Sequence, residues 1–85
     1  MYSLTLLNGP EKHETTSESL LEALNEFKSR EIQIGGMMTL KVSNGINSRE
    51  FAYKPWQLRR LLVNSFLQEV FQKRAKLLLG EDAQA

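Results

Sequence analysis

The sequence predicts an α+β fold: a three-stranded mixed sheet in the order β-α-β-β-α, covered on one face by two helices, with a long C-terminal helix. Apolar residues alternate with a period of two in three segments and recur with a helical period in two others. The alternating segments are residues 2–7, 31–43 and 49–53, and the helical segments are residues 15–30 and 54–80. With 85 residues, 41% of them hydrophobic, we expect one domain at 1–80 and a disordered tail at 81–85.

The first strand is indicated by Tyr2, Leu4 and Leu6, which fall on one side of an extended chain. Residues 8–10 read Asn-Gly-Pro and end this strand, because all three residue types favour turns. Residues 11–14 are polar, so we expect a loop there.

The first helix is predicted to begin at Thr15, because Thr15 and Glu18 have the spacing of a capping box. An apolar stripe follows at Leu20, Leu21, Ala23, Leu24 and Phe27. Glu18, Glu22 and Glu26 share another face, and Arg30 relieves the repulsion at Glu26. A single helix face does not supply ligands from several directions, so we interpret these glutamates as solvated rather than as a cation site.

The second strand is predicted to begin near Ile32 and Ile34 and to be interrupted by a bulge at residues 35–36, which are both glycine. A phosphate-binding loop is disfavoured, because no Gly-Lys-Ser/Thr follows. Asn-Gly at 44–45 predicts a turn, in a loop of more than two residues, before an antiparallel third strand at 49–53. Because a helix separates the first two strands, we expect a right-handed crossover that places them parallel.

The C-terminal segment, residues 54–80, is predicted to form one continuous helix from Pro55 to a stop at Gly80. Its apolar stripe is Leu58, Leu62, Val63, Phe66, Leu67, Val70, Phe71 and Leu78. We expect Trp56 in its first turn to anchor the helix against the sheet edge. A helix of this length measures roughly 36 Å, whereas the strands span roughly 17–23 Å. The end of the helix should therefore extend past the sheet.

An overhanging apolar helix needs another surface to cover it. We therefore expect a protein partner or a homodimer to contact the end of the long helix. The residues predicted for this interface are Val70, Phe71, Leu77, Leu78 and Leu79.

The alternative function is binding of RNA or DNA, because charge is unevenly distributed along the chain. Residues 1–34 contain three basic and six acidic side chains, a net −3, whereas residues 49–76 contain seven basic and two acidic ones, a net +5. The basic residues that could contact phosphates are Arg49, Lys54, Arg59, Arg60, Lys73, Arg74 and Lys76. Tyr53 and Trp56 are candidates for base stacking. A solvated surface or an acidic partner protein accounts for the same pattern.

No enzymatic activity is expected. The chain has one histidine, His13, and no cysteine, which disfavours a catalytic site, a metal site and a bound cofactor, and we expect no small-molecule substrate. No apolar run is long enough to span a bilayer or to form a signal-peptide core, so we expect a cytoplasmic protein that does not bind membranes. The sequence therefore favours a small accessory module that acts through contacts with itself or with a larger partner.

Overall fold

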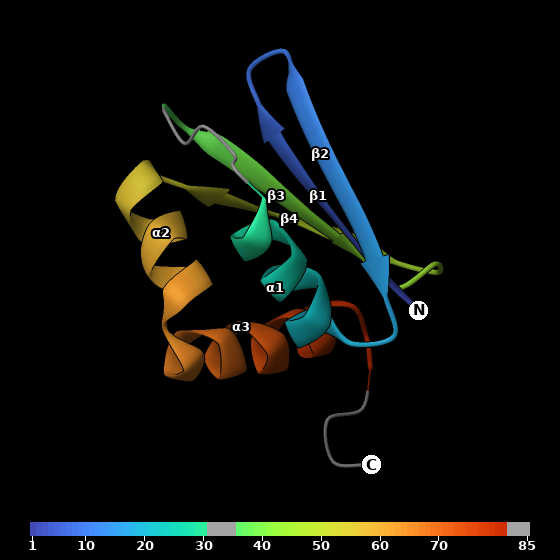
Figure 1. The fold of residues 1–85 in the computed structure, drawn as a ribbon. Helices are drawn as coiled ribbons and strands as arrows, with labels where there is room; N and C mark the ends of the chain where they lie inside the picture. The colour runs from blue at the N-terminus through green and yellow to red at the C-terminus, as the bar shows by residue number, and fades with distance from the viewer. Residues whose placement is uncertain (31–35, 82–85) are drawn as a thin grey trace.

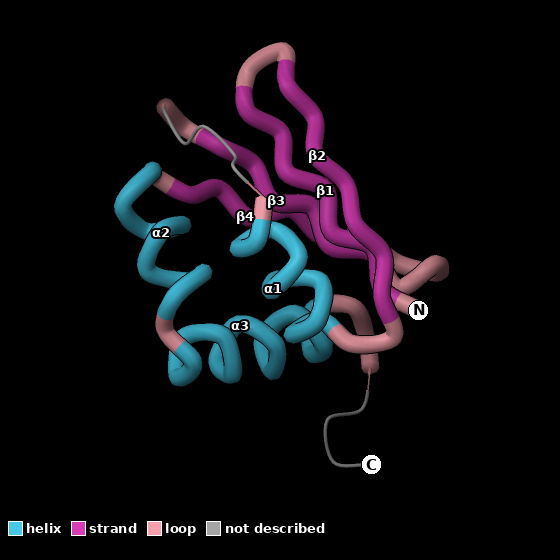
Figure 2. Tube along the Cα trace, viewed as in Figure 1, coloured by secondary structure: helices cyan, strands magenta, loops and turns pink. Residues whose placement is uncertain are grey.

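Within residues 1–30 and 36–81, which the computed structural model describes, the chain forms a four-stranded antiparallel sheet with three helices on one of its faces (Figures 1 and 2). In chain order the elements are β1 (Tyr2–Asn8), β2 (Glu11–Ser17), α1 (Leu20–Ser29), β3 (Met38–Ser43), β4 (Ser48–Tyr53), α2 (Pro55–Val63) and α3 (Ser65–Leu78). The strands lie side by side in the order β2-β1-β3-β4. The predicted α+β class is confirmed, whereas the predicted three-stranded mixed sheet is wrong.

The polar segment after the first turn is a strand and not the predicted loop. Residues 11–14 lie within β2, which pairs along its whole length with β1, starting with Asn8 opposite Glu11. Gly9 has φ 61°, a conformation that suits glycine at the first central residue of a two-residue hairpin turn. β2 is an edge strand with charged side chains in solvent, so it lacks the apolar alternation that marks a half-buried strand.

This hairpin sets the direction of the strands that follow. β2 and β3 both run antiparallel to the central strand β1, so they run parallel to one another on either side of it. α1 connects them and packs on β1 and β2 as it crosses the sheet. The predicted parallel pairing of the first strand with the strand after α1 is wrong, because β2 reverses the chain once more before α1.

α1 begins later than predicted. Ser19 is its N-cap, and the Ser19 Oγ accepts a hydrogen bond of 3.2 Å from the N–H of Leu21. Thr15 instead lies in β2, where its buried hydroxyl donates to Glu26 Oε2 at 3.3 Å. The capping box predicted for Thr15 and Glu18 is therefore wrong. The predicted apolar stripe is confirmed: its buried members are Leu20, Ala23, Leu24 and Phe27.

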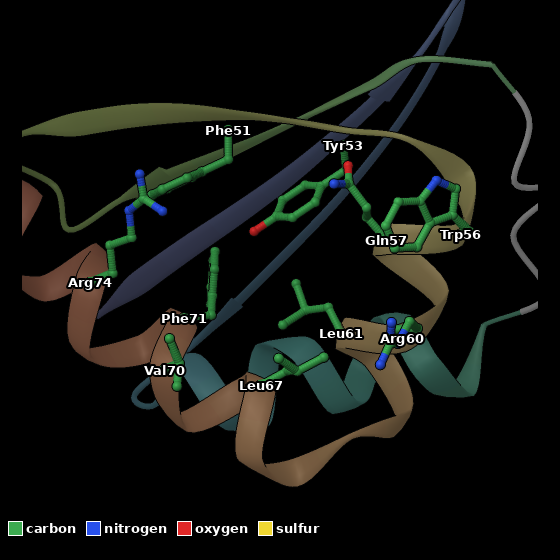
Figure 3. A pocket seen from close by; sticks show the side chains of 10 residues that line it. All are labelled: Phe51, Tyr53, Trp56, Gln57, Arg60, Leu61, Leu67, Val70, Phe71 and Arg74. Carbon is green, nitrogen blue, oxygen red and sulfur yellow. The ribbon is translucent and has the colours of Figure 1, made fainter.

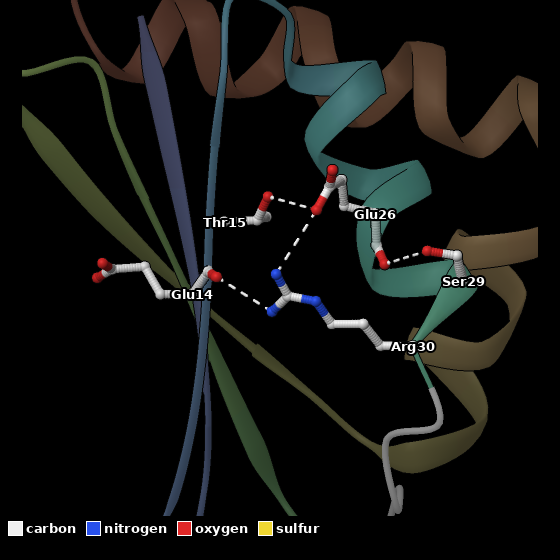
Figure 4. A network of polar contacts seen from close by, with 5 residues as sticks. All are labelled: Glu14, Thr15, Glu26, Ser29 and Arg30. Atoms are coloured by element: carbon white, nitrogen blue, oxygen red, sulfur yellow. Dashed lines mark hydrogen bonds and ion pairs between the residues drawn. The ribbon is translucent and has the colours of Figure 1, made fainter.

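A polar network fastens the end of α1 to β2 (Figure 4). Arg30 Nη2 lies 3.5 Å from Glu26 Oε2, which is the ion pair that the four-residue spacing predicts. Arg30 Nη1 also donates to the backbone carbonyl of Glu14 at 3.1 Å, and the Ser29 hydroxyl donates to the carbonyl of Glu26 at 2.8 Å. Because β2 is an edge strand, the contact with Glu14 covers part of an otherwise open row of backbone groups.

β3 and β4 form the predicted antiparallel hairpin, joined by residues 44–47. Within this loop Asn44 Oδ1 accepts hydrogen bonds from the N–H groups of Ile46 at 3.0 Å and Asn47 at 2.8 Å. The predicted loop of more than two residues is confirmed. The predicted strand start and glycine bulge fall largely on residues 31–35, which lie outside the described residues.

The single long helix predicted for the C-terminal part is wrong, because Asn64 divides it into α2 and α3. Asn64 has an extended backbone, with φ −113° and ψ 112°. Its N–H donates to the carbonyl of Arg60 at 3.0 Å and ends α2. Its Oδ1 then accepts from the N–H of Leu67 at 3.1 Å, which makes the same residue the N-cap of α3.

The break lets each helix bury a face of its own, and the two helices run at a clear angle to one another (Figure 1). The buried residues are Leu58, Leu61 and Leu62 on α2, and Phe71, Ala75 and Leu79 on and just after α3. The predicted stripe is therefore confirmed in part, whereas Val63, Phe66, Val70 and Leu78 are exposed. The stripe assumed an unbroken helical period through Asn64, and the extended residue shifts that period.

Gly80 ends α3 as predicted, with φ 85°. The N–H of Gly80 donates to the carbonyl of Leu77 at 3.1 Å, and the N–H of Glu81 donates to that of Lys76 at 2.9 Å. This pair of bonds is a Schellman motif, in which glycine takes the left-handed conformation. The remainder of the predicted tail, residues 82–85, lies outside the described residues.

The end of α3 is tied to two distant parts of the sheet. Glu81 accepts hydrogen bonds from the Tyr2 hydroxyl of β1 and from Asn44 Nδ2 at 3.1 Å, and Asn47 Nδ2 donates to the carbonyl of Leu79 at 2.9 Å. The hydrogen bond to Glu81, burial and the charge of Glu81 raise the pKa of Tyr2 to about 12. The same hydrogen bond lowers the pKa of Glu81, with smaller contributions from Asn44 and nearby positive charges.

We expect Asn64→Ala to lower the free energy of unfolding by about 1 kcal/mol, because alanine cannot accept the hydrogen bond that begins α3. Urea denaturation measures this loss. Asn25→Ala is the matched control, since Asn25 is exposed in the middle of α1, where alanine is the better helix former. An equal loss in both variants would show that Asn64 does not act as a cap.

We expect Tyr2→Phe to destabilise the protein by at most about 1 kcal/mol at pH 7, because neither side chain of the pair is fully buried. The lowered pKa of Glu81 means that its contribution is present above about pH 4.3, the ordinary glutamate value, and is lost as pH falls through the folded pKa. The raised pKa of Tyr2 means that its contribution is present below about pH 10 and is lost as pH rises toward 12.

The difference in melting temperature between wild type and Tyr2→Phe should therefore become smaller below about pH 4 and again in strong alkali. Tyr53→Phe is the control, because burial and not a carboxylate raises the pKa of Tyr53. A difference between wild type and Tyr2→Phe that stays constant from pH 7 to about pH 3 would rule out the coupling to Glu81.

Candidate protein-interaction surface

Three apolar side chains lie exposed along one side of α3, and we name Phe66, Val70 and Leu77 the α3 stripe. Their exposed fractions are 69%, 48% and 62%. The buried residues Phe71 and Ala75 point to nearly the opposite side of the helix, at about 100° of rotation per residue. α3 is therefore apolar on two sides, and the described residues cover one of them.

A groove lies between β4 and the two C-terminal helices, and we name it the β4 groove (Figure 3). Its volume is about 330 Å³. The side chains that line it are Phe51, Tyr53, Trp56, Gln57, Arg60, Leu61, Leu67, Val70, Phe71 and Arg74. Mostly apolar and aromatic walls with a few polar groups are typical of a binding site.

The aromatic walls of the β4 groove come from the sheet and from both helices. Phe51 of β4 and Phe71 of α3 meet edge to face, with 5.4 Å between ring centroids and 61° between ring planes. Trp56 of α2 stands at one end and is 54% exposed, so the expected anchor against the sheet edge leaves much of its indole in solvent. Tyr53 points into the groove; burial raises its pKa, and the nearby Arg74 partly opposes that rise. Its neutral hydroxyl therefore offers both a donor and an acceptor there.

Positive charge accompanies these apolar walls. Arg60 projects from α2 and Arg74 from α3, and the lining contains no aspartate or glutamate among the described residues. Glu50 of β4 is paired in register with Lys41, on strand positions whose side chains face the side of the sheet away from the helices. The β4 groove thus joins an apolar surface to an unbalanced pair of cations.

A second hollow lies where the end of α1 meets α2, and we name it the basic pocket. Its volume is about 400 Å³, and its lining is Phe27, Lys28, Arg30, Arg59, Arg60, Leu62 and Val63. The fold brings Lys28 and Arg30 to the same surface as Arg59 and Arg60, although the two pairs are far apart in sequence. Arg60 lines both the basic pocket and the β4 groove, so the two sites adjoin across α2.

The residues predicted for a partner interface divide between surface and core. Val70, Leu77 and Leu78 are exposed, whereas the chain itself buries Phe71 and Leu79. A partner that binds this side of α3 would therefore contact Phe66 and would not contact the buried Phe71 and Leu79.

The basic residues predicted for nucleic-acid contact do not form one stripe. Arg60 and Arg74 line the β4 groove, and Arg59 joins Arg60 at the basic pocket. The remaining four are dispersed: Arg49 donates to the adjacent carbonyl of Ser48 at 2.9 Å, Lys54 precedes α2, and Lys73 and Lys76 lie on α3.

Several residues of these surfaces were not predicted as site residues. Phe66 was placed in the apolar stripe of one continuous helix, and recognising Asn64 as a cap would have moved it to the exposed side. Lys28 and Arg30 reach the basic pocket through the packing of α1 against α2, for which the sequence carries no local signal.

His13, the single histidine, lies on β2, with its Nε2 3.2 Å from Glu11 Oε2. In the described part of the chain, no three side chains of the types that bind metals converge on one point. Among the described helices, none is both long and apolar enough to cross a membrane. Comparisons with protein-family models, curated proteins and solved structures find no match to this chain.

Proposed function

We propose that this chain is a non-enzymatic protein-interaction module whose first partner is a second copy of itself, bound through the α3 stripe. The observation that carries this proposal is the second apolar side of α3, opposite its buried side. Phe66 and Leu77 are each more than 60% exposed on a helix that already has a core-facing side. Apolar side chains aligned on a helix surface are the usual contact between packed helices.

The α3 stripe suits a two-fold contact between antiparallel helices. Phe66 and Leu77 are placed nearly symmetrically about the middle of α3, so each would pack on the other residue of the partner helix. Glu69 and Lys73 lie on the same flank of the stripe, at about 100° per residue. In an antiparallel pair a given flank meets the same flank of the other copy, which brings Glu69 near the partner's Lys73. This combination of apolar and charge complementarity favours a second copy over an unrelated helix.

We expect the wild-type protein to sediment with twice the 9.8 kDa mass of one chain at high concentration, and the Phe66→Ser/Leu77→Ser variant to sediment as a monomer. Loss of the two contacts between Phe66 and Leu77 should weaken the dimer by at least about tenfold. Ile46→Ser is the matched control, because Ile46 is 88% exposed in the β3–β4 loop and does not belong to the α3 stripe. A wild-type protein that stays monomeric at all concentrations, or a double variant that dimerises as tightly as Ile46→Ser, would contradict the proposal.

The second candidate function is nucleic-acid binding, and the basic pocket is the observation that favours it. Four cations from α1 and α2 surround an apolar floor at one surface. Lysine and arginine side chains grouped in this way bind phosphates of RNA or DNA through charge, with a strong dependence on salt.

We expect the Arg59→Gln/Arg60→Gln variant to lose affinity for a labelled single-stranded RNA and for a labelled DNA duplex, if the basic pocket holds phosphates. Fluorescence anisotropy between about 50 and 200 mM salt would then show a steep fall for wild type and a shallower one for the variant. Lys12→Gln/Lys41→Gln is the matched control, since it removes two charges from the uncovered face of the sheet. Wild-type binding that is absent at 50 mM salt, or equal in both variants, would exclude this function.

A further inference from the structure

The outer edge of β4 has backbone groups that no described strand uses. β4 is the last strand of the sheet and pairs with β3 alone. The N–H of Asn44 donates to the carbonyl of Asn47 at 3.1 Å, so these two residues form a hydrogen-bonded pair of the β3–β4 ladder. In an antiparallel ladder every second pair is hydrogen-bonded. Residues 49, 51 and 53 therefore bond to β3, and the backbone groups of Glu50 and Ala52 point away from it.

The opposite edge of the sheet, β2, is protected against pairing with another strand, whereas β4 is not. β2 presents four consecutive polar side chains, Glu-Lys-His-Glu at 11–14, and Arg30 covers the carbonyl of Glu14. Charges and covering side chains are the usual means by which edge strands avoid pairing. β4 instead carries Phe51, Ala52 and Tyr53 in succession, and among the described residues no side chain of α1, α2 or α3 bonds to the outward backbone of Glu50 or Ala52.

The β4 groove lies directly beneath this open edge. Phe51 and Tyr53 of β4 form its upper wall, and Leu61 and Val70 belong to the helices below (Figure 3). A strand added to β4 would direct alternate side chains to the same side as Phe51 and Tyr53, because side chains alternate across a sheet. Those side chains would enter the groove, and the intervening ones would face solvent.

The charge of the groove indicates the chemistry of the added strand. Arg60 and Arg74 have no acidic residue beside them in the lining. Planar guanidinium groups bind carboxylates with two hydrogen bonds, so an acidic segment would supply the missing partner. A second copy of β4 is disfavoured, because pairing two β4 edges would bring Arg60 and Arg74 of both copies together.

We infer that β4 accepts an extended acidic segment of another protein as a fifth strand, with apolar side chains in the β4 groove and carboxylates on Arg60 and Arg74. Backbone hydrogen bonds to Glu50 and Ala52 supply the pairing, and the groove supplies selectivity, as in other cases of strand addition. This inference does not rest on the α3 dimer. Because Val70 belongs to both the α3 stripe and the β4 groove, the test is repeated on the Phe66→Ser/Leu77→Ser variant, where binding is expected to persist.

The test uses a synthetic octapeptide with both ends blocked, in which the residues on the groove side of the strand read Asp, Leu, Phe and Asp and the intervening residues are threonine, so that apolar side chains and carboxylates face the groove together. Trp56 is the single tryptophan and lines the groove, so its fluorescence should change on binding and saturate. Hydrogen exchange of the Glu50 and Ala52 amides should slow in the complex. Arg60→Gln/Arg74→Gln should weaken binding by about tenfold, whereas the charge-matched control Lys12→Gln/Lys41→Gln should not.

Two modified peptides separate strand addition from other modes of binding. N-methylation of the peptide amides on one edge should reduce affinity at least about tenfold, while N-methylation of those on the other edge should not, because only one edge can face β4. A peptide with lysine in place of aspartate should not bind. The inference fails if no saturable change occurs below about 1 mM peptide, if the lysine peptide binds equally, or if both methylated peptides bind like the parent.

Discussion

Asn64 is the constraint on which the helical layer depends. A continuous helix from Pro55 to Gly80 would measure roughly 36 Å and would extend past strands of six or seven residues. Asn64 removes this mismatch, because its extended backbone turns α3 until the end of that helix meets the β3–β4 loop, where Asn47 bonds to the Leu79 carbonyl. The same residue shifts the helical period, so that Phe71 faces the core while Phe66 faces solvent. Asn64 thus determines both how α3 packs within the chain and which apolar side chains of α3 are exposed to a second copy.

Elements with strong local signals could be predicted from the sequence. The stripe from Leu20 to Phe27, the turn at Asn44 and the helix stop at Gly80 each rest on chemistry within a few residues. β2 could not be found from apolar alternation, because a solvated edge strand such as Glu11–Ser17 carries none. Gly9, followed by Pro10, was nevertheless a signal for a two-residue hairpin turn, and taking it as one would have given the antiparallel sheet.

The candidate surfaces were harder to predict, because they depend on contacts between distant segments. Leu77 and Val70 follow from the amphipathic pattern of α3 alone. The β4 groove requires Phe51 of a strand to meet Phe71 of a helix, and the basic pocket requires α1 to lie against α2. Composition gives the charges of Arg60 and Arg74 but not their position beside an apolar groove. The sequence therefore gives the type of each side chain directly, whereas the neighbours of that side chain in space require the folded structure.

The bond between Tyr2 and Glu81 joins residues separated by 79 positions, with consequences for assembly during synthesis. Of the four strands β1 is the first to leave the ribosome, yet it lies between β2 and β3. Its hairpin with β2 is local and can form early, whereas pairing with β3 waits until the chain has grown past α1. The hydrogen bond that fastens the end of α3 must come last, because Glu81 emerges after every residue that it contacts. A nascent chain that ends just before Glu81 would contain all four strands. It would lack the carboxylate that accepts hydrogen bonds from both Tyr2 of β1 and Asn44 of the β3–β4 loop.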